Sequence, residues 1–118
     1  MTHKNLLIWK KSMELVMVIY QTTRAFPESE KYGLIQHLRK TVISIPSNIA
    51  EGAGRGTTRE YLRFLDIATG SLAELETQLI ISKELGYILH SETINKEIRS
   101  LNHLFRKMKD SLGNKLNS

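Results

Sequence analysis

Apolar residues recur every three or four positions along most of this chain, the spacing that brings side chains to one face of an α-helix. Four segments carry this pattern, and we expect helices over residues 7–23, 30–49, 57–85 and 91–112. No segment alternates apolar and polar residues between turn signals, so no β-sheet is predicted. The pattern therefore indicates an all-α protein.

Each expected helix has its own apolar stripe. The stripes of the first two helices consist of Trp9, Met13, Val16 and Tyr20, and of Leu34, Leu38, Val42, Ile45 and Ile49. The third and fourth helices carry heptad seams, which consist of Tyr61, Leu65, Ala68, Leu72, Leu75 and Leu79, and of Ile94, Ile98, Leu101, Phe105, Met108 and Leu112. Such seams on helices joined by short links favour antiparallel neighbours. We predict a single domain over residues 1–118, an antiparallel up-and-down four-helix bundle.

Residues 44–56 combine Pro46 with three glycines at alternate positions. Proline lacks the N–H that a helix interior needs, and glycine weakens a helix, so continuous helix is not expected here. We predict a corner, with a kink or a local end of the second helix near Pro46. The polar residues Ser29, Thr57 and Ser91 are placed to cap the second, third and fourth helices.

Some apolar residues fall outside the four stripes. They are Ile8, Leu15, Ile19, Leu62, Phe64, Ile67, Ile80 and Ile81. Exposed apolar patches of more than a few hundred Å² usually mark an interface, which predicts self-association. The alternative is a wide apolar stripe with some partly exposed aliphatic side chains. Gly70 weakens the third helix unless another backbone approaches closely, so we expect tight helix packing there.

The 118 residues include 17 Lys and Arg against 12 Asp and Glu, which gives a net charge of +5. The excess lies in residues 1–24 and 92–118, and basic surfaces of this kind attract phosphate backbones. The candidate nucleic-acid-binding residues are Lys10, Lys11, Arg55, Arg59, Arg63, Lys96, Arg99, Arg106, Lys107 and Lys109. The alternative for these side chains is an ordinary solvated face.

The arginines at the start of the third helix are the most informative of these candidates. Arg55, Arg59 and Arg63 lie one turn apart, where they repel one another and oppose the helix dipole. Either Glu51 and Glu60 compensate them within the chain, or a phosphate backbone does.

Nothing in the sequence predicts an enzyme. The histidines show no spacing typical of a metal site, there are no cysteines, and no serine has a recognisable base partner. We therefore expect no catalytic residue, no metal site and no cofactor. No apolar run reaches the length of a membrane span and no signal peptide is present, so a cytoplasmic protein is expected.

Three stretches of the chain resemble a known family. Residues 44–55 read SIPSNIAEGAGR, residues 68–79 read ATGSLAELETQL, and residues 85–87 read LGY. Together with Trp9, Phe26-Pro27, Glu30 and Tyr32-Gly33-Leu34 they resemble the four-helix bundle proteins encoded in intervening sequences of bacterial 23S ribosomal RNA genes. The resemblance covers roughly residues 6–90, and the fourth helix is similar only in kind.

The resemblance implies an up-and-down bundle that assembles as a homopentameric ring. A related branch, the accessory variability determinant of diversity-generating retroelements, is a basic pentamer that associates with a reverse transcriptase and with nucleic acid. The residues that match the family signature are Ser47, Asn48, Glu51, Gly52, Arg55, Gly70, Ser71 and Glu74. The match leaves open whether they serve fold or function.

The residues and the resemblance together predict a non-enzymatic, basic, oligomeric bundle that binds RNA or DNA through phosphate contacts. The alternative is a protein-interaction adaptor that docks a reverse transcriptase or another partner without binding nucleic acid.

Overall fold

The structure, a computed structural model, describes residues 2–88 and 91–116. These residues form four α-helices, α1 (Leu7–Thr23), α2 (Leu34–Ala53), α3 (Thr58–Glu84) and α4 (Glu92–Leu116). Two short 3-10 helices, η1 (His3–Asn5) and η2 (Glu28–Glu30), precede α1 and α2. The described residues contain no strand, which confirms the all-α prediction.

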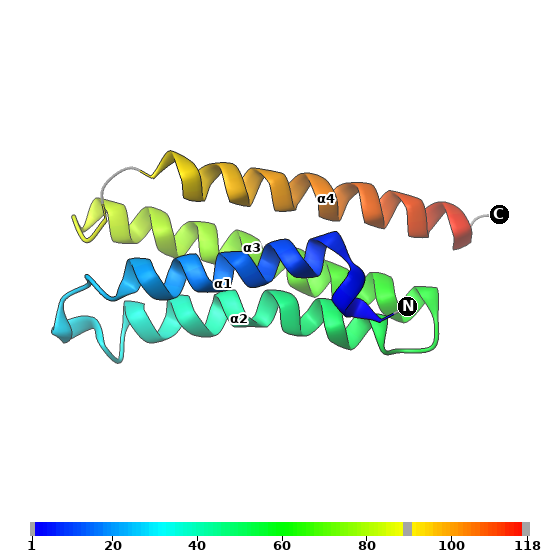
Figure 1. The fold of residues 1–118 in the computed structure, drawn as a ribbon, viewed down its shortest axis with the longest axis horizontal. Coiled ribbons are helices and arrows are strands. Elements are labelled where there is room, and N and C mark those ends of the chain that lie inside the picture. The colour runs from blue at the N-terminus through cyan, green and yellow to red at the C-terminus, as the bar shows by residue number, and fades with distance from the viewer. Residues whose placement is uncertain (1, 89–90, 117–118) are drawn as a thin grey trace.

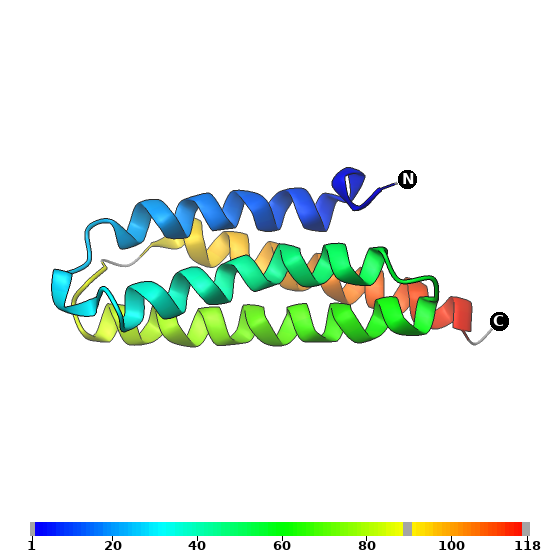
Figure 2. The same ribbon diagram turned by 90° about the horizontal axis from the view of Figure 1, so that it is seen from below.

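The four helices lie side by side in a rod with extents of 51 × 23 × 20 Å (Figure 1). Each helix packs on the next one along the chain, and α4 also packs on α1. Within the described residues the backbones of α1 and α3 are not in contact, and Figure 2 shows these two helices on opposite sides of the rod. Both chain ends lie at the same end of the rod (Figure 1).

The core is aliphatic with one fully buried aromatic ring, Phe105. The predicted stripes of α2, α3 and α4 supply most of it, and these buried residues are Leu38, Val42, Ile45, Ile49, Leu65, Ala68, Leu72, Leu75, Leu79, Ile94, Ile98, Leu101 and Phe105. Leu34, Tyr61, Met108 and Leu112, at the ends of these stripes, are only partly buried. Three of the four predicted stripes are therefore correct over most of their length.

The predicted stripe of α1 is only partly correct: Trp9 and Val16 are partly buried and pack against the core, but they do not form the buried row of this helix. Met13 is 40% exposed, and the residues that face the core are Ile8, Ser12, Leu15, Ile19 and Thr23. The two hydroxyl groups of this row do not prevent burial, because each donates to a backbone carbonyl of its own helix. Ser12 Oγ lies 2.8 Å from the Trp9 oxygen, and Thr23 Oγ1 lies 2.8 Å from the Ile19 oxygen.

The boundaries of α2 also differ from the prediction. The helix begins at Leu34, where the carboxylate of Glu30 rather than the side chain of Ser29 accepts the Leu34 amide at 3.2 Å. It runs without interruption through the buried Pro46 and ends at Ala53. The predicted corner is thus reduced to the short link between α2 and α3.

Two of the predicted caps are confirmed, and the end of α4 is corrected. Thr57 Oγ1 accepts the Glu60 amide at 3.1 Å, and Ser91 Oγ accepts the Ile94 amide at 3.3 Å. The fourth helix continues past the predicted end at residue 112, through Gly113, to Leu116. None of the described helices combines the length and apolarity that crossing a bilayer requires.

Candidate nucleic-acid interface

The three arginines around the link between α2 and α3 divide into two that are paired and one that is not. Arg55 lies 2.7 Å from the carboxylate of Glu51, and Arg63 lies 3.4 Å from that of Glu60. Arg59 is exposed and has no carboxylate within 4 Å among the described residues. Internal compensation therefore accounts for two of the three charges.

Phe64 fixes the positions of the two paired arginines. The guanidinium carbons of Arg55 and Arg63 lie 5.0 and 5.2 Å from the centre of its ring, within the range of a cation–π contact. The ring is nearly buried because α2 and α3 approach closely at Gly52. A Cβ atom at Gly52 would lie only 2.8 Å from the Cβ of Phe64.

The basic residues of α4 follow one side of that helix. Arg99 bonds Glu92 at 2.9 Å, and Lys109 reaches Asp66 of α3 at 3.3 Å. The other candidates of α4 are exposed and have no ion pair among the described residues; these are Lys96, Arg106 and Lys107. Lys10 of α1 is likewise exposed and has no ion pair there.

The first helix joins this surface at the end of the rod that holds both termini. Leu7 of α1 and Leu104, Lys107 and Met108 of α4 line a shallow hollow where the two helices meet. Lys10 is exposed on α1, whereas Lys11 is partly buried. The structure thus brings basic residues from the two ends of the chain to the same end of the rod.

This end of the rod carries the net charge of the protein. We call residues 2–15, 44–71 and 104–116 the terminal half, because they occupy the part of each helix on the side of the two chain ends (Figure 1). The terminal half has ten Lys and Arg against five Asp and Glu, whereas the other described residues have seven of each. The excess comes from the two chain ends, residues 2–15 and 104–116, whereas residues 44–71 are neutral overall. The structure places the two basic ends of the sequence at the same end of the rod (Figure 1).

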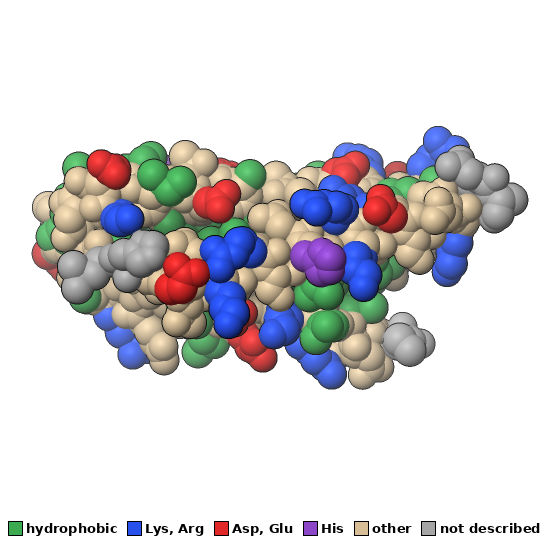
Figure 3. Space-filling view, turned by 90° about the horizontal axis from the view of Figure 1, so that it is seen from above, with side chains coloured by type: hydrophobic (Ala, Val, Ile, Leu, Met, Phe, Trp, Pro, Cys, Tyr) green, Lys and Arg blue, Asp and Glu red, His purple; other side chains and the backbone are tan. Residues whose placement is uncertain are grey.

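Figure 3 shows the side of the rod on which α4 lies. Lys and Arg side chains gather over this face, with separate acidic side chains between them. Such a mixed surface attracts polyanions by its summed field rather than by one preformed pocket.

The family-signature residues separate into two groups. The first group lies on α2 and the link that follows it. The Asn48 side-chain amide donates to the Ser44 carbonyl at 2.7 Å, Glu51 pairs with Arg55, and Gly52 allows the contact with α3. Ser47, on the same helix, is exposed.

The second group lies on the surface of α3. Gly70 is exposed, and no atom of another helix lies within 4 Å of the position that a Cβ would occupy there, so the predicted tight packing at Gly70 is not found among the described residues. Ser71 is partly buried, and the exposed carboxylate of Glu74 accepts the Gln78 side-chain amide at 3.3 Å.

Sequence reasoning missed a contact at the other end of the rod. The Tyr87 hydroxyl donates to Glu30 Oε2 at 2.9 Å, while Glu30 Oε1 holds the first amide of α2. The bond to this carboxylate is the main reason that the pKa of Tyr87 is raised above its ordinary value. One side chain thus joins the α1–α2 link to the α3–α4 link, and the sequence separation of 57 positions hides this contact from any local pattern.

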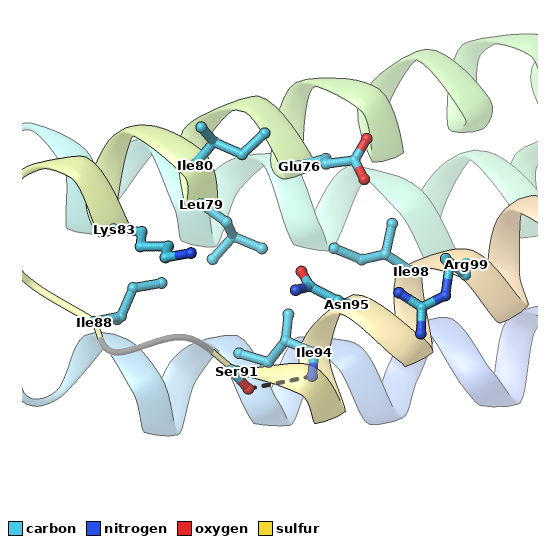
Figure 4. Close-up of a pocket in the computed structure, with 10 residues that line it drawn as sticks. All are labelled: Glu76, Leu79, Ile80, Lys83, Ile88, Ser91, Ile94, Asn95, Ile98 and Arg99. Carbon is cyan, nitrogen blue, oxygen red and sulfur yellow. Dashed lines mark hydrogen bonds between the residues drawn. The ribbon is translucent and has the colours of Figure 1, made fainter.

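It also missed a groove between the C-terminal part of α3 and the N-terminal part of α4. Leu79, Ile94 and Ile98 form its apolar floor, and Glu76 and Asn95 are among its polar margins (Figure 4). The described residues include no group of three side chains able to hold a metal ion. His90, one of the four scattered histidines, lies outside the described residues.

Of the comparisons with known proteins, one identifies a family. A comparison with curated proteins finds no significant match. A family model, described as 23S rRNA-intervening sequence protein, matches residues 4–110, which include all of α1, α2 and α3 and most of α4. The chain therefore belongs to the 23S rRNA-intervening sequence protein family.

Proposed function

We propose that this protein is a non-enzymatic scaffold that binds RNA or DNA through phosphate contacts, as an antiparallel up-and-down bundle assembled into a homopentamer. The observation that carries the proposal is the location of the whole net charge of +5 in the terminal half. Arg59, Arg106 and Lys107, all in that half, are exposed and have no carboxylate within 4 Å among the described residues.

The chemistry of these side chains suits backbone contacts rather than base reading. Lys and Arg on the outside of a convex rod meet phosphates, and phosphate contacts carry little sequence information. Binding is expected to be weakly sequence-specific and to fall steeply with salt, because each neutralised phosphate releases counterions.

Assembly into a ring would strengthen this binding. A single rod offers only a few unpaired cations, and contacts made by linked copies add up as effective concentration. The homopentamer is taken from the family resemblance, and the exposed apolar residues that remain on α1 and α3 support self-association.

The proposal is tested by titrating a labelled ribosomal RNA hairpin and a duplex DNA at several salt concentrations. A matched pair of variants locates the site: Arg106→Gln/Lys107→Gln in the terminal half, and Lys31→Gln/Lys40→Gln in the other half. Each pair removes two charges. We expect the first pair to weaken binding and to reduce the slope of log K against log salt by about 2, and the second to leave both nearly unchanged.

Equal losses of affinity in the two double variants would contradict a nucleic-acid-binding site in the terminal half. Absence of binding by the wild-type protein at about 50 mM salt, where phosphate contacts are strong, would contradict nucleic-acid binding altogether.

The second candidate is an adaptor that docks a protein partner, such as a reverse transcriptase, while its charge serves solubility. The observation that favours it is the groove between α3 and α4, whose floor is apolar. If the wild-type protein binds no nucleic acid in the titration, the adaptor function is the candidate that remains.

A further inference from the structure

Two helices on opposite sides of the rod carry most of the exposed large apolar side chains. Met13 and Met17 of α1 are 40% and 60% exposed, and Ile67 and Ile81 of α3 are 41% and 43% exposed. The second and fourth helices each expose a single large apolar side chain, Ile43 and Leu116, among the described residues. Since α1 and α3 are diagonal in the bundle (Figure 2), the protein has two separate apolar faces.

These faces have opposite charge. The α1 face, consisting of Lys10, Met13, Glu14, Met17, Gln21 and Arg24, is basic on balance, and all of its residues are exposed. The α3 face consists of Asp66, Ile67, Gly70, Glu74, Thr77, Ile81 and Glu84, also all exposed. Asp66 pairs with Lys109 of α4, which leaves Glu74 and Glu84 as the carboxylates that carry the negative charge of this face. Between residues 64 and 82, α3 has three carboxylates and no Lys or Arg.

Gly70 lies in the middle of the α3 face. Glycine weakens a helix interior, and among the described residues no atom beyond the neighbouring residues and nearby backbone of α3 lies within 4 Å of a Cβ position at Gly70. The matching glycine on α2, Gly52, faces the core, and there a neighbouring helix occupies the space. Gly70 therefore offers on the outside of the protomer the same close approach that Gly52 provides inside it.

We propose that the α1 face of one copy packs on the α3 face of the next copy, with the α1 side chains passing over Gly70. Pairing of two α1 faces or two α3 faces would oppose like charges, whereas α1 on α3 opposes unlike ones. The two faces are different surfaces, so the contact is head-to-tail, and copies repeated in this way form a closed ring when their rotation closes. This proposal rests on the proposed assembly and names its interface.

The absence of cysteine from the chain makes the contact directly testable by cross-linking. Single variants Met17→Cys and Thr77→Cys are prepared separately and mixed with a short bismaleimide. We expect a cross-linked dimer in the mixture and none from either variant alone. The control replaces Thr77→Cys by Ile43→Cys, at an exposed site of α2, and should give none.

A second measurement uses Gly70 and Gly113, two helical glycines with open space at the position of an added Cβ. Gly70→Leu should lower the molar mass found by light scattering to that of a monomer, with helix content by circular dichroism unchanged. Gly113→Leu, on α4, is the matched control and should leave the oligomer intact, since no atom lies within 4 Å of its Cβ position either.

Each outcome decides the proposal. Cross-linking within a single variant, equal cross-linking with Ile43→Cys, or an oligomer that survives Gly70→Leu would overturn the interface and leave the assembly standing. A wild-type protein that is monomeric at micromolar concentration would overturn both.

Discussion

Gly52 lies where α2 contacts α3 closely. An added Cβ would lie 2.8 Å from the Phe64 Cβ and 3.2 Å from a ring carbon of Tyr61, closer than packed side chains allow. We expect Gly52→Ala to lower the free energy of unfolding by about 1–3 kcal/mol, the usual cost of overpacking. Gly54→Ala is the control, because its nearest neighbours would be at ordinary contact distances of 3.5 and 3.6 Å. Urea unfolding measures both, and equal effects would contradict this role of Gly52.

Tyr87 gives a pH-dependent prediction at the same scale. Its hydroxyl donates to Glu30, and the bond raises the pKa of Tyr87 above the ordinary value of 10.0. The neutral, donating form is favoured in the folded state, so the stabilisation is complete below pH 10 and is lost as the pH rises through the raised pKa. Tyr87→Phe should therefore lower the Tm at pH 7, with a difference from wild type that shrinks above pH 10.

Thermal unfolding at a series of pH values checks this prediction. Tyr32→Phe is the control, since Tyr32 is 80% exposed and should respond little at any pH. Burial also raises the pKa of Tyr61, but Tyr61 is present in all three proteins, so its contribution to the Tm cancels when they are compared. A Tm difference between Tyr87→Phe and wild type that stayed constant from pH 7 to well above pH 10 would contradict the assigned bond.

At the scale of elements, the longest helix depends on its cap. Thr57 Oγ1 accepts the Glu60 amide, while the Glu60 carboxylate turns to Arg63. We expect Thr57→Ala to cost about 1 kcal/mol of stability, with Thr57→Ser close to wild type because serine retains the acceptor. Denaturant unfolding compares the two, and equal losses would indicate that the methyl group rather than the cap matters.

Sequence patterning predicts α3 and α4 well because each has one continuous apolar seam. The first helix has two apolar rows, one through Met13 and one through Leu15, and only contacts with α2 and α4 decide which row is buried. The extent of α2 was equally undetermined, since a buried proline such as Pro46 can be held inside a helix by the packing around it.

The candidate site shows the same division between local and tertiary information. The pairs Arg55–Glu51 and Arg63–Glu60 are three or four residues apart and could be predicted as alternatives from helix geometry. The contact of Lys109 with Asp66 joins residues on different helices. The excess positive charge of the two chain ends could be predicted from the sequence, whereas its concentration at one end of the rod depends on how the four helices pack.

At the scale of the whole molecule, the proposed ring separates assembly from binding. If α1 and α3 make the contacts between copies, α2 and α4 remain on the free surfaces of the ring. The exposed cations Lys96, Arg106 and Lys107 all lie on α4, so the ring would present five copies of this row on one surface. Binding variants on α4 should then leave the oligomer intact, whereas assembly variants on α3 should also weaken nucleic-acid binding, because the contacts of linked copies no longer add up.

The same architecture makes stability depend on protein concentration. When unfolding requires dissociation, a 100-fold rise in concentration stabilises each chain by about 2 kcal/mol, and the Tm should rise by several degrees. Gly70→Leu, expected to be monomeric, should have a Tm that does not change over the same range, while Gly113→Leu should behave like the wild type. Differential scanning calorimetry over this range checks all three proteins. A wild-type Tm that stayed constant on dilution, with light scattering still reporting a pentamer, would mean that the chains unfold without leaving the ring.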